Sequence, residues 1–397
     1  MLRWYRRYAD TVLAALPSNR LLALDAMRGF AIMAMILVNN PGSWSHIYAP
    51  LQHAQWHGWT VTDLIFPFFI IIVGFSLQLT LSQNKSVSRA LQLRHGAIRS
   101  VKLFGLGLFL ALFYYNFRDP AFDYIQHKLL AIRWLGVLQR IALVYFALTL
   151  IVLFCHSRGR VVWLLGLCLL YLFGLWFVPY QDASGHRFSG LWQFGNNFAA
   201  WLDHNLLGRS HLYYRDATPF AFDPEGLWST LPAIASGLTG VLMAQWWQSG
   251  RDTVQKIRGL MLFGAVTVWL ALLWHARVPI NKNLWTPSFV LLSSGYFALL
   301  MAAVLWLTEI KRWRRWSAPL VVLGVNAILF FLFAGVAARL LLMISVADMS
   351  LQQWLFRSLF QPLLGNLNGS LAYALSFLLL SYVLMHYCYK RGYIFKV

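Results

Sequence analysis

Residues 21–40 read LLALDAMRGFAIMAMILVNN, and residues 52–79 read QHAQWHGWTVTDLIFPFFIIIVGFSLQL. Each stretch contains an apolar run of about the 20 residues that a helix needs to cross a bilayer. The chemistry-bearing side chains of this hairpin and its loop are Asp25, Arg28, His46, His53, His57 and Asp63. Charge is costly inside a bilayer, so charged groups in such sequence point to a functional site.

The composition is that of an integral membrane protein. Hydrophobic residues make up 59% of the 397 residues and charged residues only 12%, against about 25% in an average soluble protein. The chain is therefore expected to be an all-α polytopic membrane protein with about ten transmembrane helices. We place the spans at residues 21–39, 61–81, 97–115, 134–155, 161–178, 227–246, 259–275, 285–307, 318–344 and 371–389. The span at 318–344 is long enough to be one tilted helix or a broken pair.

The net charge of +20 follows the expected topology. Ten spans and a cytoplasmic N-terminus put both termini in the cytoplasm, and the loops then expected inside are richer in Lys and Arg than those outside. This is the positive-inside rule. The orientation of the chain in the membrane and its contact with anionic lipids therefore explain the positive net charge. Nucleic acid is not expected as a partner.

Two segments differ from the spans. Residues 1–19 are basic and aromatic, which is typical of a segment lying in the membrane interface. Residues 20–397 form a single transmembrane domain whose periplasmic loop at 179–226 is too long for an ordinary connection, so we expect a lid or a binding surface there. The three cysteines fall at or inside spans without clustering, so neither a disulfide framework nor a zinc site is expected.

His53 and Asp63 fit acid–base chemistry. Imidazole suits a general base because it titrates near neutral pH, and a carboxylate in the first turn of the next helix can orient the ring. His53 and His57 would share a face if their loop is helical. Ala54 stands where an HExxH motif has Glu, so no metal is expected. Local hydrogen bonding of interfacial histidines is the alternative that spacing leaves open.

Amides and a charge pair in the first span are further candidates. Asn39 and Asn40 end this span in the outer leaflet, where an amide either caps the helix or donates to an oxyanion. Asp25 and Arg28 are one turn apart near the cytoplasmic end. They form a structural pair, or Arg28 meets an anionic ligand.

Other charged residues lie near the outer ends of later spans. Arg133 and Arg140 share a face of one span, and Arg140 is deep enough to need a carboxylate or a polar cavity. Lys282 between Asn281 and Asn283 is either a phosphate clamp or an ordinary loop cation. A second acidic pair either stabilises the start of the sixth span or contacts a cationic substrate. These two acids are Asp223 and Glu225.

Six blocks together resemble the heparan-α-glucosaminide N-acetyltransferase family and its bacterial relatives. The blocks are LLALDAMRGFAIMAMILVNNPG, HAQWHGWTVTDLIFPFFIIIVG, IRWLGVLQRIALVYF, DPEGLWST, PINKNLWTPSFVLLSSG and GVNAILFF. The resemblance runs from about residue 20 to the C-terminus. The second and fifth blocks are specific, whereas the LDxxRG opening is shared with a wider set of membrane acyltransferases.

The resemblance implies an acetyl-CoA-dependent enzyme that acetylates the amine of glucosamine or a related amino sugar across the membrane. It assigns the catalytic histidine to His53, the active-site asparagine to Asn39 and an active-site aspartate to Asp63. Acetyl-CoA, the co-substrate, would enter from the cytosol with Arg28 or Arg140 lining its passage. His53 would act as general base in a ternary complex or would itself carry the acetyl group.

Departures from the family pattern narrow these expectations. The usual WNG is Trp56-His57-Gly58 here, so His57 is not expected to be the essential histidine. The luminal N-terminal domain of the animal enzyme is not seen, so the chain resembles the bacterial core, expected in the bacterial inner membrane. The family also suggests a homodimer.

Two other functions remain possible from the sequence. A transporter for a sugar or an anionic metabolite would suit ten spans with buried charges, but it would be expected to show inverted repeats. An O-acyltransferase acting on a cell-envelope glycan is the second. That class tends to carry its histidine at the end of the LDxxRG helix, where this chain has Asn39 and Asn40.

Overall fold

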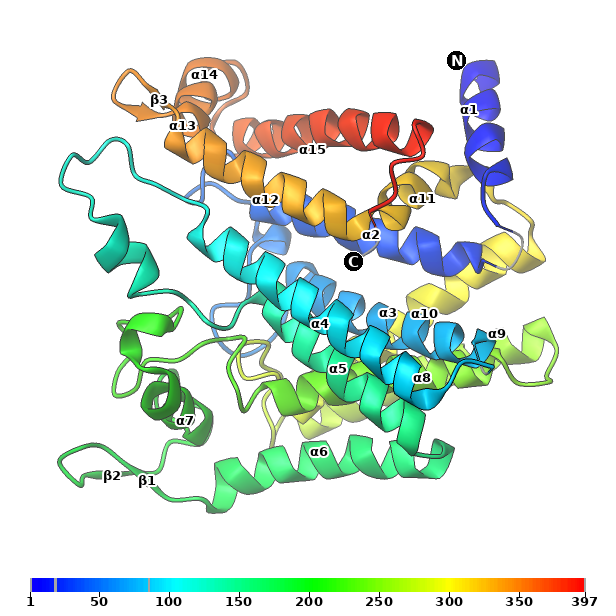
Figure 1. Ribbon diagram of the computed structural model, residues 1–397, viewed down its shortest axis with the longest axis horizontal. Helices are drawn as coiled ribbons and strands as arrows, with labels where there is room; N and C mark the ends of the chain where they lie inside the picture. The colour runs from blue at the N-terminus through cyan, green and yellow to red at the C-terminus, as the bar shows by residue number, and fades with distance from the viewer. Residues whose placement is uncertain (1, 18–19, 85, 396–397) are drawn as a thin grey trace.

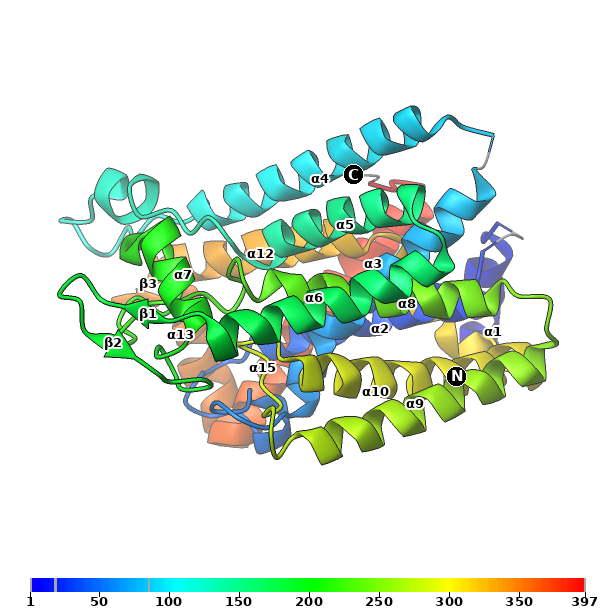
Figure 2. The ribbon, with the colours of Figure 1, turned by 90° about the horizontal axis from the view of Figure 1, so that it is seen from below.

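The computed structural model describes residues 2–17, 20–84 and 86–395 (Figure 1). The chain is predominantly helical, as predicted. Its long helices run roughly parallel to one another, and the short elements α7, β1, β2 and β3 gather at one end of the bundle (Figure 2). The predicted interfacial segment 1–19 includes residues 1, 18 and 19, which lie outside the described residues; the rest of it contains helix α1.

The described residues form fifteen α-helices and four short strands. In chain order they are α1 (Leu2–Ala14), α2 (Leu22–Asn39), α3 (Val61–Gln83), α4 (Arg89–Leu112), α5 (Val137–Phe154), α6 (Ser157–Phe177), β1 (Tyr180–Gln181), β2 (Arg187–Phe188), α7 (Phe198–Leu207), α8 (Thr230–Trp247), α9 (Thr253–Trp274), α10 (Pro287–Leu305), α11 (Ala318–Val325), α12 (Ala327–Met343), β3 (Ser345–Val346), β4 (Met349–Ser350), α13 (Leu351–Leu355), α14 (Gln361–Leu364) and α15 (Asn366–Lys390). Single 3₁₀ turns lie at Ala49–Leu51, Arg209–His211 and Arg315–Ser317, and single π turns at Ile125–Leu129, Trp306–Ile310 and Phe356–Phe360.

The expected ten spans are confirmed as helices but not as ten membrane crossings. Within the described chain, eight helices are long and apolar enough to cross a membrane, and the bent pair α11–α12 would make nine. Helix α8 occupies the sixth expected span, 227–246, but is not among them. It is rich in small and polar residues, and 12 of its 18 residues are buried by neighbouring helices rather than offered to lipid.

Glycines allow close approach of the helices that carry the site. A Cβ on Gly29 of α2 would lie 1.8 Å from the backbone oxygen of Leu320 in α11. A Cβ on Gly74 of α3 would lie 1.9 Å from the oxygen of Gly237 in α8. Small residues at such crossings are typical of helix pairs in membranes. Helices α2 and α3 are therefore held tightly in the centre of the bundle.

The span predicted at 318–344 is a broken pair. Helices α11 and α12 meet at Asn326 with a bend of 69°. The Asn326 side chain donates to the carbonyl of Tyr393 and accepts from the amide of Phe395, so the C-terminal segment satisfies the break. Helix α1 also packs against α11. Both terminal segments thus lie at the end of the bundle that contains Arg28, called here the Arg28 end.

The long loop predicted at 179–226 is ordered at the opposite end, called here the His53 end. It contains the β1–β2 hairpin and α7, which the sequence did not predict. Its aromatic side chains form a separate cluster that includes Phe198, Phe220 and Phe222. The partly buried Trp56 packs against this cluster, so the loop covers one side of the segment that carries His53.

Candidate active site

His53 and Asp63 form the predicted pair at the start of α3. The Nδ1 atom of His53 lies 2.7 Å from Oδ1 of Asp63. The other carboxylate oxygen accepts the backbone amides of Ala54 and Thr60, each at 3.0 Å. Asp63 therefore caps its own helix, as expected of a carboxylate in a first turn. The same side chain fixes the loop before it and orients the His53 ring.

Lys282 completes this group from the loop between α9 and α10. Its Nζ lies 3.6 Å from Oδ1 of Asp63, and 3.1 and 3.4 Å from the two ring nitrogens of His53. The two nitrogens point in different directions, so one ammonium cannot bind both in the ring plane, and Lys282 lies beside the ring. Burial lowers the pKa of Lys282, and Asp63 and Glu225 oppose part of that shift.

A cavity of about 250 Å³ opens in front of these residues. Besides the His53 loop, its wall is formed by the end of α2, the start of α3, the start of α5, and the loops before α5, α8 and α10. Its lining residues are Met35, Val38, Asn39, His53, Thr62, Ile65, Phe66, Arg133, Val137, Tyr213, Tyr214, Pro224, Glu225, Lys282 and Asn283. Half of the His53 side chain is exposed, whereas that of Asp63 is buried, so the ring is offered to the cavity while its partner is not.

The loop that carries His53 is anchored on both sides. The indole of Trp56 donates to the carbonyl of Trp192 at 2.6 Å. The buried amide of Asn281 donates to the carbonyl of Trp56 at 2.8 Å, and its oxygen accepts from Leu284. Asn281 is therefore a structural link between two loops, while its neighbours Lys282 and Asn283 line the cavity.

His57 is separated from His53. The loop is not helical, so the condition for a shared face fails. His57 lies near Asn281, with 3.5 Å between its Nδ1 and the amide nitrogen, and is not among the residues that line the His53 cavity. Burial, with His275 as a second cause, lowers the pKa of His57. The structure thus places the two histidines in different surroundings.

The two asparagines at the end of α2 also differ. Asn39 is exposed and lines the His53 cavity. Asn40 is buried, and its amide donates to the carbonyl of Ile36 one turn earlier at 2.7 Å. It lines a smaller cavity of about 150 Å³, between α2 and α12, rather than the His53 cavity. Of the two amides, Asn39 alone is placed to meet a ligand beside His53.

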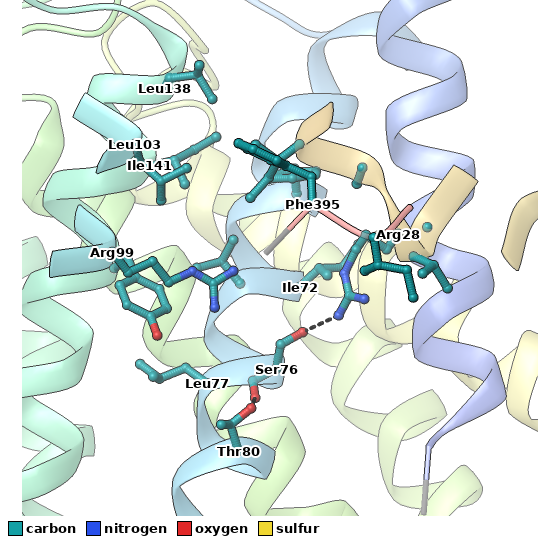
Figure 3. A pocket seen from close by; sticks show the side chains of 18 of the residues that line it. Arg28, Ile72, Ser76, Leu77, Thr80, Arg99, Leu103, Leu138, Ile141 and Phe395 are labelled. Carbon is teal, nitrogen blue, oxygen red and sulfur yellow. Dashed lines mark hydrogen bonds between the residues drawn. The ribbon is translucent and has the colours of Figure 1, made fainter. Parts of the chain in front are cut away.

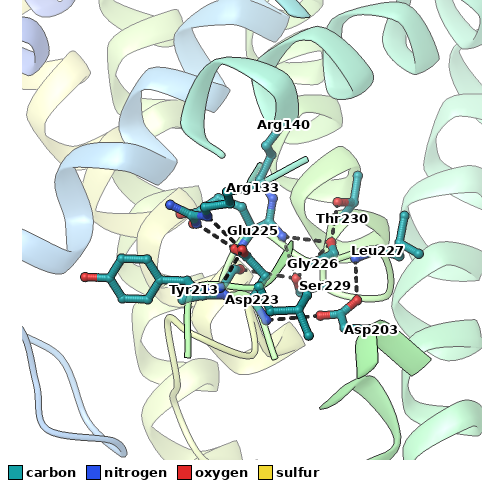
Figure 4. Close-up of polar contacts among 12 residues, drawn as sticks. Arg133, Arg140, Asp203, Tyr213, Asp223, Glu225, Gly226, Leu227, Ser229 and Thr230 are labelled. Carbon is teal, nitrogen blue, oxygen red and sulfur yellow. Dashed lines mark hydrogen bonds and ion pairs between the residues drawn. The ribbon is translucent and has the colours of Figure 1, made fainter. Parts of the chain in front are cut away.

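Arg133, Arg140, Asp223 and Glu225 form one buried network beside the cavity (Figure 4). Arg133 donates to both oxygens of Asp223, at 2.7 and 2.6 Å, and to Glu225 at 2.5 Å. Arg140 is fully buried and donates to the carbonyl of Gly226 and to Ser229. Arg133 is therefore paired with both acids, whereas Arg140 forms no ion pair with a described carboxylate. Of these four residues, only Arg133 and Glu225 reach the cavity wall.

A third carboxyl, Asp203 of α7, completes the network. It accepts from the amide of Leu227 at 2.9 Å and lies against Gly226, where a Cβ would be 1.9 Å from its oxygen. Burial raises the pKa of Asp203 to about 7, and the nearby charge of Asp223 adds to the shift. Burial also raises the pKa of Glu225, but Arg133, Arg140 and Lys282 outweigh it and lower that pKa overall. With Asp203 protonated, two arginines balance two carboxylates.

A second cavity lies along the same helices at the Arg28 end. It has a volume of about 430 Å³ and is lined by Arg20, Arg28 and Arg99 together with apolar residues of α3 and α5. Figure 3 shows the side chains of Arg28 and Arg99 entering it from different helices. Arg28 donates to Asp25 at 2.9 Å and to Ser76 at 2.7 Å, which holds its guanidinium at the cavity wall.

The chain matches the acyltransferase domain family over residues 21–386. The chain belongs to this acyltransferase family. It is also 28% identical over 370 residues to human heparan-alpha-glucosaminide N-acetyltransferase and 26% identical over 359 residues to the mouse enzyme. The aligned regions cover 80% and 79% of this chain but 53% of each relative, so the chain spans about half the length of these curated relatives. These matches confirm the family that the sequence motifs predicted.

The structure adds residues of this acyltransferase that the sequence did not single out. Tyr213 and Tyr214 line the His53 cavity from the 179–226 loop. Asp203, in α7 of the same loop, accepts a hydrogen bond from the amide of Leu227. The sequence signals were weak, because a Tyr pair and an Asp in a polar loop are common. Lys282 was predicted, but as a phosphate clamp rather than as a neighbour of His53. The metal-free expectation remains a prediction.

Proposed function

We propose that this acyltransferase moves an acetyl group from acetyl-CoA to the amine of glucosamine or a related amino sugar. The observation that carries the proposal is the His53–Asp63 pair, in which Asp63 is buried and the ring faces a cavity. The similarity to N-acetyltransferases supports the choice of donor and acceptor. As a co-substrate, acetyl-CoA would be consumed rather than held permanently.

His53 would act as the general base. With Asp63 ionised, Nδ1–H donates to the carboxylate, which leaves the Nε2 lone pair free. Nε2 takes a proton from the acceptor ammonium, and the neutral amine attacks the thioester carbonyl carbon. The C–S bond then breaks and CoA leaves as a thiolate, which takes the proton that the newly acylated amine nitrogen loses. The proton held by His53 passes to solvent, which restores the neutral ring. Asp63 stabilises the imidazolium during these steps.

Asn39 and Lys282 would stabilise the negative charge that develops on the carbonyl oxygen. Both line the cavity that His53 faces. An amide donor and an ammonium aimed at the oxygen where negative charge develops stabilise an oxyanion. Glu225, on the same wall, would attract the cationic amine before it loses its proton.

The donor would approach from the Arg28 end, which we assign to the cytosol. Residues of α2, α3 and α5 line both the cavity at the Arg28 end and the His53 cavity. Phe69, which lines the first, is only three residues from Phe66, which lines the second. This corresponds to about 4.5 Å along a helix. Arg20, Arg28 and Arg99 would bind the CoA phosphates, and the pantetheine arm would pass between the helices.

A two-step route through an acetylated His53 uses the same residues. In that route the ring nitrogen attacks the thioester first, CoA leaves, and the amine then attacks the acetyl-imidazole. Incubation with labelled acetyl-CoA in the absence of acceptor separates the routes. Label that stays on wild-type protein and is lost in His53→Ala supports the two-step route, and its absence supports the ternary complex.

The proposal is tested by acetyl transfer from labelled acetyl-CoA to glucosamine by the purified full chain. Glucose serves as the matched acceptor that has a hydroxyl in place of the amine. Formation of N-acetylglucosamine with no product from glucose is the expected result. O-acetylation of glucose without N-acetylation would favour the O-acyltransferase function. Uptake of sugar into proteoliposomes with no acetylation would favour a transporter.

A further inference from the structure

A third cavity lies beside the His53 cavity and is rich in cations. It has a volume of about 350 Å³ and is enclosed by α4, α5, α12 and the loops before α5 and α8. Gly107, Leu110 and Phe331 form part of an apolar side. Lys128, Arg215 and Arg339 supply positive charge from three separate segments. We call these three residues the cationic pocket.

The charge of the cationic pocket is not balanced within the described chain. No Asp or Glu is among its described lining residues, and none of its three cations forms an ion pair with a described carboxylate. Arg215 and Arg339 donate only to backbone carbonyls, of Ala131 and Leu212 and of Gly335. This contrasts with Arg133 on the same wall, which two carboxylates neutralise.

Lys128 is affected by the other two cations of the pocket. Burial lowers the pKa of Lys128, and the charges of Arg339 and Arg215 lower it further. The Lys128 ammonium lies 4.8 Å from the centre of the Tyr114 ring, which orients it without neutralising it. Three cations held together by the fold without a counter-charge form a site for an anion, because a bound anion removes their mutual repulsion.

The cationic pocket adjoins the candidate active site. Arg133, Val137 and Tyr213 line both cavities, so the two cavities meet at these residues. At this junction the Arg133 guanidinium lies 4.8 Å from the centre of the Tyr213 ring. A ligand with its amine at His53 would therefore have its other end near the cations.

We propose that the cationic pocket binds a phosphate ester group of the acceptor, so that the preferred acceptor is a phosphorylated amino sugar rather than the free sugar. This inference rests on the proposed function for the amine that is acetylated. The choice of anion rests on Lys128, Arg215 and Arg339 alone. Arginine and lysine donors are suited to the several oxygens of a phosphate.

The test compares glucosamine with glucosamine 1-phosphate and glucosamine 6-phosphate, using the full chain in nanodiscs of phosphatidylcholine. Wild-type protein should show a KM about tenfold lower for at least one phosphate than for glucosamine, the effect of one charge-assisted contact. Lys128→Gln and Arg339→Gln should remove that preference and leave the KM for glucosamine within about twofold, whereas Lys128→Arg should keep it. Arg187→Gln, at an exposed residue of β2, is the matched control.

Equal KM values for the three acceptors in wild-type protein would overturn the proposal. So would an equal rise for glucosamine and the phosphates in the variants. Repeating the assay in phosphatidylglycerol separates the acceptor from a lipid headgroup as the source of phosphate. If phosphatidylglycerol abolishes the preference, the pocket holds a lipid and the acceptor assignment is wrong.

Binding to the His53→Ala protein separates this inference from the proposed function. Calorimetric titration with the two sugar phosphates requires no turnover. Binding that is lost in His53→Ala/Arg339→Gln supports the cationic pocket even if no acceptor is acetylated. Absence of binding to His53→Ala would overturn the pocket while leaving acetyl transfer to glucosamine intact.

Discussion

The Oδ1 atom of Asp63 accepts from the His53 ring at 2.7 Å, while Oδ2 of the same carboxylate accepts the amides of Ala54 and of Thr60, the residue that caps α3. One side chain therefore fixes both the start of the helix and the direction of the ring. The His53 side chain is exposed to the cavity, whereas the Asp63 side chain is buried behind it. Asp63 is never offered to a ligand, and its effect on chemistry has to pass through the imidazole.

Asp63→Asn is expected to reduce kcat without a matching change in substrate binding. Its amide oxygen would accept from Ala54 and Thr60, which leaves its NH₂ facing Nδ1 of His53. That contact moves the ring proton to Nε2 and removes the base. We expect a loss of about 100-fold or more in kcat, the scale of general base catalysis. Steady-state kinetics check this, and a kcat near that of the wild type would refute the orienting role of Asp63.

Asn39→Ala is expected to lower kcat about 100-fold if its amide stabilises the oxyanion. Asn40→Ala is the matched control, because its amide is already bound to the carbonyl of Ile36 within α2. Its effect should appear mainly as a lower melting temperature. The kcat values of both variants are measured in the same acetyl-transfer assay. Similar losses of kcat in the two variants would show that Asn39 has no special role.

The arginines at the Arg28 end are expected to govern the KM for acetyl-CoA. The double variant Asp25→Asn/Arg28→Gln avoids leaving the Asp25 carboxylate without its partner. We expect its KM for acetyl-CoA to rise about tenfold, as for one lost contact to a phosphate, with little change in the KM for the acceptor. Arg158→Gln, at an exposed residue outside this cavity, is the control. A rise confined to the acceptor would place the donor elsewhere.

The stability of the protein is expected to fall as pH rises through the pKa of Asp203. That pKa is about 7 in the folded protein, above its ordinary value of 3.8. Between pH 3.8 and about pH 7 the folded state therefore holds a proton that the unfolded state has lost. The free energy of unfolding decreases as pH rises through this range. Asp203→Asn, which resembles the protonated carboxyl, should flatten the melting temperature between pH 5 and 8. An unchanged slope in this variant would contradict a protonated Asp203.

The sequence predicted the features that depend on local pattern. Apolar runs identified helices, and a carboxylate in the first turn of a helix pointed to Asp63 as a partner for His53. Contacts between segments far apart in the chain could not be predicted from the sequence. Lys282 follows His53 by 229 residues, and only the fold brings its ammonium beside the ring. Likewise, the pairing of Arg133 with Asp223 and Glu225 could not be read from any of the three residues alone.

Helix α8 shows why the number of spans could not be settled from hydropathy. Its Gly237 and Gly240 lie against α3, and its Ser236 and Thr239 are buried. A helix surrounded by other helices needs small side chains for close contact more than it needs apolar ones. The sequence pattern of such a helix is therefore less hydrophobic than that of a helix facing lipid.

Single-turnover acetyl transfer is the most direct test of the account's central claim, that His53 performs the chemistry. Wild type, His53→Ala and His57→Ala are each mixed with labelled acetyl-CoA and saturating amino-sugar acceptor, after matching melting temperatures show that all three are folded. We predict that His53→Ala forms no product above background while His57→Ala retains most of the wild-type rate. Wild-type turnover by His53→Ala, or equal loss in both variants, would contradict the assignment.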